Sequence, residues 1–249
     1  MILIFYAFRR ELSGLRKRIT ERVPLREGLR GFKGRMGNEE LFLVATGIGV
    51  AQARESARRA LQTLARPRLV ISTGVAGALA PDLRAGDVVV ADRLLLEESP
   101  DSSFEEVARL APGIESSVRD SLTRTGLTVA TGALLTAGWL LAGVEAKRAA
   151  HSRTGAIAVD MESAVLAAEI AGAGIPFVCV RAVMDEAGDE IPGAELPDAT
   201  GHVAPLKAAA YFIRNPAALA GVPATLRKLG RATAAIASAL EALCIESRL

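Results

Sequence analysis

Short apolar runs alternate along the chain with longer stretches of helical composition. The apolar runs, which we expect to form strands, are Ile2–Phe8, Leu41–Thr46, Leu69–Thr73, Asp87–Leu96, Leu127–Ala137, Ala156–Val159 and Pro176–Met184. Helical stretches lie at Val50–Ala65, with its charges gathered on one side, and at 162–174, which is apolar nearly all round. Continuous apolar strands that alternate with helices are typical of a largely parallel sheet covered on both faces. The pattern predicts a single α/β domain over residues 1–249.

The composition fits such a domain and argues against several other classes of protein. Half of the 249 residues are hydrophobic, enough for a substantial core, and 23% are charged, an ordinary share. A net charge of +2 and an aromatic share of 4% argue against nucleic acid as a partner. Cys179 and Cys244 have neither metal-binding nor redox spacing, and buried free thiols are typical of the cytoplasm. We therefore expect a cytoplasmic protein whose N-terminal apolar run is a strand, not a signal peptide.

Two glycine-containing turns follow predicted strands. "TGIGVAQA", Thr46–Ala53, follows a strand and opens a helix as a dinucleotide-binding fingerprint does. Gln52 stands at the third glycine position, however, and no acidic residue follows about 20 positions later, which disfavours a nicotinamide site. The amides around Gly47 could still hold an anion or a hydroxyl-rich ligand. The second turn, "STGVAGAL" at Ser72–Leu79, follows another central strand. Packing could explain either turn, but together they favour a ligand crevice at the carboxyl ends of the strands.

Three carboxylates stand where predicted strands end, and a fourth has a structural explanation. Asp160 can cap the next helix by accepting a hydrogen bond from the amide of Ser163, and that role suffices for it. Glu162 falls in the first helical turn, where free amides favour the ionised form. Asp185 ends an apolar strand, and Glu11 follows the first strand. Both Glu11 and Glu162 could also be ordinary carboxylates in the first turn of a helix. Carboxylates at one sheet edge suit glycosidic cleavage, which needs an acid, a stabiliser of a cation-like transition state and an activated nucleophile.

The segments "TGIG", "STGVAGAL…GDVVVAD", "VDMESA" and "VRAVMDEAG", in this order and spacing, resemble the nucleoside phosphorylase and nucleosidase superfamily, whose members include purine and uridine phosphorylases. The resemblance covers about Ile2 to Gly188 and is strongest to the methylthioadenosine/S-adenosylhomocysteine nucleosidase branch. It implies a three-layer α/β/α sandwich with a central, mostly parallel mixed sheet. It also implies a homo-oligomer that cleaves the N-glycosidic bond of a nucleoside without a metal or cofactor, with inorganic phosphate as a co-substrate if the reaction is phosphorolysis.

Carried over to matching positions, the resemblance assigns roles to the candidate residues. Met161 would pack on the ribose, and Glu162 would bind the ribose hydroxyls. Asp185 would protonate or hydrogen-bond purine N7 and the exocyclic group, while Glu11 would position and activate the attacking water. The other substrate-lining positions would be Gly47, Val75, Ala76, Gly77 and, where an aromatic usually stacks on the base, Leu135.

The chain departs from the family pattern at several positions. Val75 stands where many members carry a serine, and Ser72 stands where bacterial purine phosphorylases keep a phosphate-binding arginine. Both changes argue mildly against phosphorolysis. Arg9 and Arg10 replace acidic residues and could hold phosphate, although a solvated helix start would explain them equally well. Met184 replaces a serine before the catalytic aspartate. The sequence therefore leaves hydrolysis and phosphorolysis open.

The C-terminal extension, at about 203–249, resembles the tail of hopanoid-associated members, whose substrate is an adenosyl lipid. Leucine and isoleucine recur there at helical spacing on one face: Leu226, Leu229, Ile236, Leu240 and Leu243. The opposite face is basic: Arg227, Lys228 and Arg231. Such a helix can lie on a membrane surface, but more often it covers its own core. The upstream segment 205–219 could form a flap over the 5′ side of the sugar.

The sequence thus favours an enzyme that releases a purine base, with adenine preferred, from a nucleoside with a modified 5′ ribose, such as adenosylhopane. A non-catalytic nucleoside-binding protein is the first alternative, which the presence of both Asp185 and Glu11 disfavours because binding alone would not need both. A dinucleotide-dependent oxidoreductase is the second.

Overall fold

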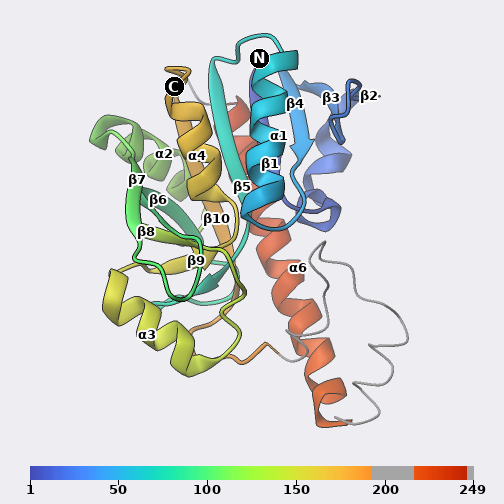
Figure 1. The fold of residues 1–249 in the computed structure, drawn as a ribbon. Coiled ribbons are helices and arrows are strands. Elements are labelled where there is room, and N and C mark those ends of the chain that lie inside the picture. The colour runs from blue at the N-terminus through green and yellow to red at the C-terminus, as the bar shows by residue number, and fades with distance from the viewer. Residues whose placement is uncertain (192–215, 246–249) are drawn as a thin grey trace.

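The computed structural model describes residues 1–191 and 216–245 (Figure 1). Its strands are β1 (Ile2–Tyr6), β2 (Thr20–Pro24), β3 (Gly31–Met36), β4 (Glu39–Ala45), β5 (Leu69–Ala78), β6 (Val88–Glu97), β7 (Glu105–Arg109), β8 (Val129–Ala137), β9 (Ala158–Asp160) and β10 (Phe177–Asp185). Its helices are the 3₁₀ turns η1 (Arg9–Leu12) and η2 (Leu15–Arg18), then α1 (Val50–Thr63), α2 (Pro112–Arg124), α3 (Val144–Thr154), α4 (Ser163–Ala171) and α6 (Pro216–Ile245).

Every strand predicted from the apolar pattern is present, and three further strands are not among those predicted. β2 is exposed along its whole length and β7 is exposed or half-buried, so neither carries a continuous apolar run. β3 alternates between buried and more exposed positions and pairs with β2 and β4. Strands of this kind form because they pair with neighbouring strands in the sheet, more than because of their own residue composition.

The strands form one mixed sheet in the order β10-β6-β8-β9-β5-β1-β4-β3-β2, with β7 on β6. β10 also pairs with β5, so β5, β10, β6, β8 and β9 close into a barrel-like ring. The central mixed sheet confirms the predicted fold class, whereas the closure depends on long-range pairings that no local pattern reveals.

The edge of β5 that faces away from β10 is shared by two shorter strands. β1 pairs in parallel with Leu69–Ser72, and β9 pairs antiparallel with Gly77 and Ala78. Among the described residues, none forms a strand beside the stretch between them, 73–76, on that edge. Side chains can therefore reach the backbone of β5 at this point, just beyond the end of β1.

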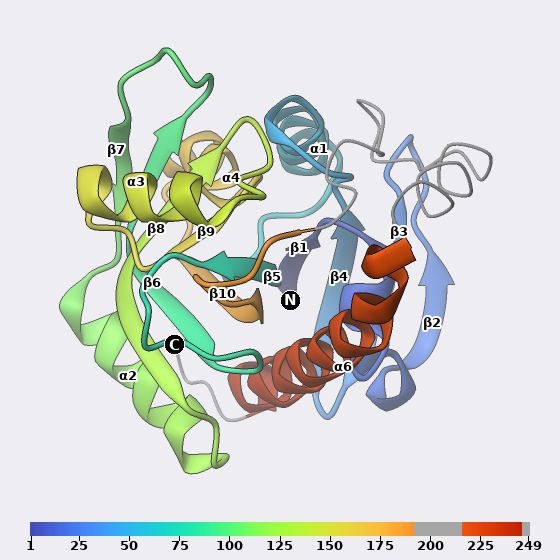
Figure 2. The same ribbon diagram turned by 90° about the horizontal axis from the view of Figure 1, so that it is seen from below.

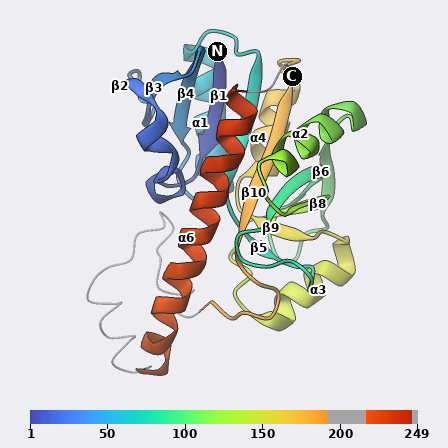
Figure 3. The same ribbon diagram turned by 180° about the vertical axis from the view of Figure 1, so that it is seen from behind.

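Helices cover both faces of the sheet, which gives the expected α/β/α layers (Figures 2 and 3). Alternate residues of β1 show the division, since Ile2 and Ile4 belong to one apolar cluster and Leu3 and Phe5 to the other. The first cluster lies under α2 and α6, and the second lies under α1 and α4.

The C-terminal half of α6 packs on the domain's own core. Ile236, Leu240 and Leu243 are fully buried in the first cluster, whereas Leu226, in the N-terminal half of the helix, is 54% exposed. This confirms the core-packing interpretation for that half. None of the described helices is both long and apolar enough to cross a bilayer. Contact with a membrane surface stays a prediction. The predicted flap was 205–219, and its first part, 205–215, lies outside the described residues.

The substitution Leu240→Ala tests this packing. We expect it to lower the free energy of unfolding by about 2–5 kcal/mol, because it removes buried methyl groups and leaves a cavity. Leu226→Ala on the same helix is the matched control, for which we expect a change within about 0.5 kcal/mol. Urea denaturation followed by circular dichroism measures both. Equal stabilities would contradict the packing of α6 on the core.

Candidate active site

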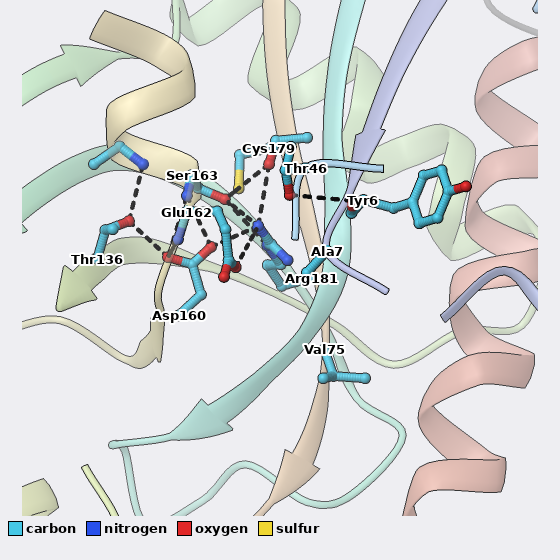
Figure 4. A network of polar contacts seen from close by, with 12 residues as sticks. Tyr6, Ala7, Thr46, Val75, Thr136, Asp160, Glu162, Ser163, Cys179 and Arg181 are labelled. Atoms are coloured by element: carbon cyan, nitrogen blue, oxygen red, sulfur yellow. Dashed lines mark hydrogen bonds and ion pairs between the residues drawn. The ribbon is translucent and has the colours of Figure 1, made fainter. Parts of the chain in front are cut away.

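A fully buried arginine lies at the centre of the candidate site (Figure 4). Nη2 of Arg181, in β10, lies 2.7 Å from Oδ2 of Asp160 and 2.8 Å from Oγ of Ser163. Nε donates to the same serine oxygen at 3.0 Å, and Nη2 also reaches Oγ of Ser72 at 3.2 Å. Oε2 of Glu162 is 3.7 Å away. A buried guanidinium needs such partners, because an unpaired charge would lose its hydration without compensation.

Asp160 performs the structural role that the sequence predicts and one more. Its carboxylate accepts hydrogen bonds from the amide of Ser163 at 3.1 and 3.3 Å, as expected at the start of α4. The hydroxyl of Thr136 donates to Oδ1 at 2.6 Å. The ion pair with Arg181 adds a contact to β10 that sequence spacing does not show. Asp160 therefore links the end of β9, the start of α4 and β10.

Glu162 comes from the start of α4 and reaches the first glycine turn. Its Oε1 accepts the backbone N–H of Gly49 at 2.8 Å. Gly49 has a φ of 97°, a conformation that suits glycine, and it precedes α1 directly. Burial raises the pKa of Glu162 to about 8; the cation of Arg181 opposes this, and the charge of Asp160 adds to it. A carboxyl group with such a pKa can accept a hydrogen bond when it is ionised and donate one when it is protonated.

Glu11 is held by backbone amides on both sides of the β1–β5 pair. Oε2 accepts hydrogen bonds from Ala7 at 2.7 Å and from Phe8 at 3.1 Å, both just after β1. Oε1 accepts the amide of Val75 at 3.0 Å, within the stretch of β5 that lies beyond β1. Burial raises the pKa of Glu11, while Arg181 and these amides oppose the rise. The carboxylate is rigidly oriented and nearly inaccessible.

Gly74 allows Glu11 and Arg181 to approach each other. Its φ is +146°, and a Cβ there would lie 2.3 Å from Nη1 of Arg181 and 2.4 Å from Oε1 of Glu11. Nη1 is buried and has no hydrogen-bond partner within the described part of the chain. A buried donor beside a buried carboxylate is an arrangement that can orient one small polar molecule.

Asp185 ends β10 and faces a separate buried cation. Oδ2 accepts a hydrogen bond from Nζ of Lys147, in α3, at 2.5 Å. A Cβ on Gly77 would lie only 2.8 Å from the same oxygen, so the glycine in "STGVAGAL" makes room for the carboxyl group. Burial raises the pKa of Asp185, and the charge and hydrogen bond of Lys147 oppose the rise.

The other predicted residues fall in different environments. Ala76 is buried between the positions of β5 that contact Glu11 and Asp185, and Met161 is half-buried between the two acids of "DME". Gly47 has a φ of 84° in the turn before α1. Arg9 and Arg10 are exposed on η1, which suits a solvated turn. Their contact with phosphate stays a prediction.

The placement of Leu135 corrects one expectation. Its side chain is fully buried in a third apolar cluster with Leu79 and Leu95, so it presents no surface to a base. β8 continues two residues further, to Ala137. The exposed apolar side chain of this region is Leu140, beyond the end of the strand, with 42% of its surface exposed.

The two buried cations, Arg181 and Lys147, are not among the residues predicted from sequence. Arg181 had a signal, since a charge inside the otherwise apolar run "PFVCVRAVM" needs a buried partner. Lys147 had none, because α3 carries other charged residues that are exposed to solvent.

Comparison with known proteins identifies the family. Residues 2–212 match the family described as the Phosphorylase superfamily. A 5′-methylthioadenosine/S-adenosylhomocysteine nucleosidase of Geobacillus thermodenitrificans is 30% identical over 202 residues, which cover 75% of this chain and 84% of the relative.

Solved structures agree on the fold. The Neisseria meningitidis 5′-methylthioadenosine/S-adenosylhomocysteine nucleosidase, in complex with methylthio-immucillin-A, has a TM-score of 0.76 at 19% identity and covers 99% of both chains. The native futalosine hydrolase of Helicobacter pylori has a TM-score of 0.73 at 20% identity and covers 99% of this chain and 97% of that one. With the family match and the nucleosidase relative, these findings confirm the resemblance seen in the sequence: the chain belongs to the phosphorylase superfamily and is an enzyme, a nucleosidase or a nucleoside phosphorylase.

Proposed function

We propose that the protein hydrolyses the N-glycosidic bond of an adenine nucleoside that carries a 5′ substituent. The observation that supports hydrolysis most directly is the pair of buried groups beside Gly74. There the carboxylate of Glu11 lies close to the same point as Nη1 of Arg181, which has no hydrogen-bond partner among residues 1–191 and 216–245. A water molecule can donate a hydrogen bond to the first group and accept one from the second, so its oxygen lone pair is oriented for attack.

The charges around this point suit water better than phosphate. Three buried carboxylates, those of Glu11, Asp160 and Glu162, surround the single guanidinium of Arg181. A phosphate ion would add negative charge to this cluster, and it is usually bound by several cations or amides. Lys147 is already engaged by Asp185. Acidic side chains also favour the cation-like sugar that forms as a glycosidic bond breaks, because a positive charge close to them favours their ionised form.

The reaction then divides between two ends of the site. On the base side, Asp185 gives a proton to purine N7, the C1′–N9 bond breaks, and its electron pair stays with the purine. On the sugar side, Glu162 holds the ribose hydroxyls, and Met161 packs on the sugar. Glu11 takes a proton from the water whose oxygen bonds to C1′. The raised pKa of the buried Glu11 suits a group that accepts a proton in this step.

Hydrolysis predicts that base release does not depend on phosphate. We expect methylthioadenosine to give free adenine and the free thioribose in phosphate-free buffer, at a rate that added phosphate leaves unchanged. Chromatography of base and sugar measures both products. Base release that requires phosphate, with a sugar 1-phosphate as product, would refute hydrolysis. If no nucleoside releases base, a non-catalytic nucleoside-binding protein becomes the better description.

The substitution Glu11→Gln tests the base role of Glu11. It keeps the size of the side chain but cannot take the proton, so we expect kcat/KM to fall by about 10²–10⁴-fold.

The acid role of Asp185 is tested by Asp185→Asn. The amide cannot donate an acidic proton to the purine, so we expect kcat/KM to fall by about 10²–10⁴-fold while the protein stays folded. Steady-state kinetics measures the loss, and thermal unfolding reports on the fold. An Asn variant as active as the parent enzyme would refute the acid role.

The proposal that the substrate carries a 5′ substituent is based on the names of the relatives and on the C-terminal sequence. The curated relative is named for 5′-methylthioadenosine and S-adenosylhomocysteine, both of which carry a thioether at the 5′ carbon. We propose that an apolar 5′ group contributes to binding here too, and that it extends to an adenosyl lipid such as adenosylhopane. The homo-oligomeric state, the absence of a cofactor and the cytoplasmic location stay predictions from the sequence.

Discrimination at the 5′ position is measurable. We expect kcat/KM to be at least about tenfold higher for methylthioadenosine, and for adenosine with a longer 5′ alkyl chain, than for adenosine. Each buried methylene contributes about 0.8 kcal/mol, so two or three give roughly this factor. Competition assays with mixed substrates provide the ratio directly. Equal efficiency for adenosine and every 5′-alkylated analogue would contradict the proposal.

A further inference from the structure

Lys147 is a fully buried lysine whose ammonium group is completely engaged at the end of β10. Nζ donates to Oδ2 of Asp185 at 2.5 Å, to the carbonyl of Glu186 at 2.9 Å and to the carbonyl of Asp189 at 3.0 Å. A lysine ammonium has three N–H donors, and these three acceptors use all of them. The side chain therefore has one defined position.

Stability alone is a weak explanation for this pair. Removing a carboxylate and an ammonium from water costs several kcal/mol per ion, and well-packed apolar residues often replace buried pairs without loss. Lys147 instead contacts the one carboxyl group to which the base-side chemistry is assigned. This points to a role in the reaction.

The other charged groups near Asp185 are balanced separately. Asp189, in the turn after β10, accepts hydrogen bonds at Oδ2 from the amide of Glu186 at 2.7 Å and from Nζ of Lys228 at 2.5 Å. Lys228 comes from α6 and also lies 3.8 Å from the carboxylate of Glu186. Thus Lys228 of α6 pairs with the acids of the turn, and Lys147, from α3, faces Asp185.

We propose that Lys147 is the positioning residue of the general acid. It holds Oδ2 of Asp185, leaves Oδ1 for the purine, and stabilises the carboxylate that forms when the proton leaves. This rests on the proposed function, in which Asp185 protonates the leaving base.

The physical effect of Lys147 has a definite sign. Burial raises the pKa of Asp185, and the adjacent cation lowers it, so the two effects oppose each other. Without the cation, Asp185 would hold its proton more tightly and would be a weaker acid toward N7. In the transition state the proton moves from Asp185 to the purine and negative charge develops on the carboxyl group. A fixed ammonium at 2.5 Å stabilises that charge without reorganisation.

The substitution Lys147→Met tests this role, since it keeps the length of the side chain and removes the charge. The protonated form of Asp185 is the active one, so activity falls as pH rises through its pKa. We expect the alkaline limb of the kcat/KM profile for methylthioadenosine to move upward by about 1–3 pH units, and the maximal kcat to fall. Lys147→Arg, which keeps the charge, should hold the limb near its original position.

Lys228→Met is the matched control. It removes a cation of α6 that contacts the same turn but not Asp185, and we expect the alkaline limb to stay in place. A purely structural role for Lys147 would lower activity at every pH and leave the limb of Lys147→Met unmoved as well, which would overturn the proposal.

A second readout separates this proposal from the proposed function. The pKa of Asp185 is measured directly by NMR of carboxyl-¹³C aspartate, with Asp185→Asn to assign the resonance. We expect Lys147→Met to raise this pKa, and Lys147→Gln serves the same purpose if the methionine variant does not fold. An unchanged pKa refutes the coupling. A raised pKa in a protein that cleaves no nucleoside would leave the coupling in place and refute the proposed function.

Discussion

The burial of Arg181 is the constraint on which the rest of the site depends. A guanidinium inside β10 must find fixed partners, and it finds them on three other elements: Asp160 at the end of β9, Ser163 at the start of α4 and Ser72 in β5. These contacts join the strands that close the barrel-like ring, where β10 and β9 both pair with β5. The same guanidinium places Nη1 beside Glu11, so the charge that organises the fold also lies on the side of the site that we propose for the nucleophile.

Two buried cations divide the site into halves with different electrostatics. Around Arg181 three acidic side chains share one guanidinium, and burial raises the pKa values of Glu11 and Glu162. That half suits a sugar that becomes positively charged and a group that takes a proton. Around Lys147 one ammonium faces one acid, Asp185, with its neighbour Asp189 balanced by a separate lysine. This half suits a group that gives a proton. Burial acts in both halves, and the number of cations per carboxylate distinguishes them.

Much of the fold and part of the site could be predicted from local pattern. The strand β10 is where the sequence places it, and Asp160 caps α4 as its position predicts. The strand β5 begins where expected but continues to Ala78, through the glycines for which the sequence predicts a turn. Glu11, Glu162 and Asp185 stand at strand ends, where polar groups meet a crevice in α/β proteins. The exposed edge strand β2 and the half-exposed β7 could not be predicted, because sheet neighbours hold them. Leu135 shows the limit of alignment by motif. The motif predicts that Leu135 lies against the base, but β8 stays buried from Ala133 to Ala137 and the leucine side chain lies inside the core.

The sequence by itself determined which residue types stand at the ends of the strands, because apolar runs and glycine turns are local properties of the chain. It also determined the family, through four motifs in fixed order. Only the tertiary structure decided which charges share a cluster, because Lys147 and Asp185 are 38 positions apart and Arg181 and Ser72 are 109 apart. The protonation of a carboxylate depends on burial and on the distance to the nearest cation, and both are set by how distant strands and helices pack together.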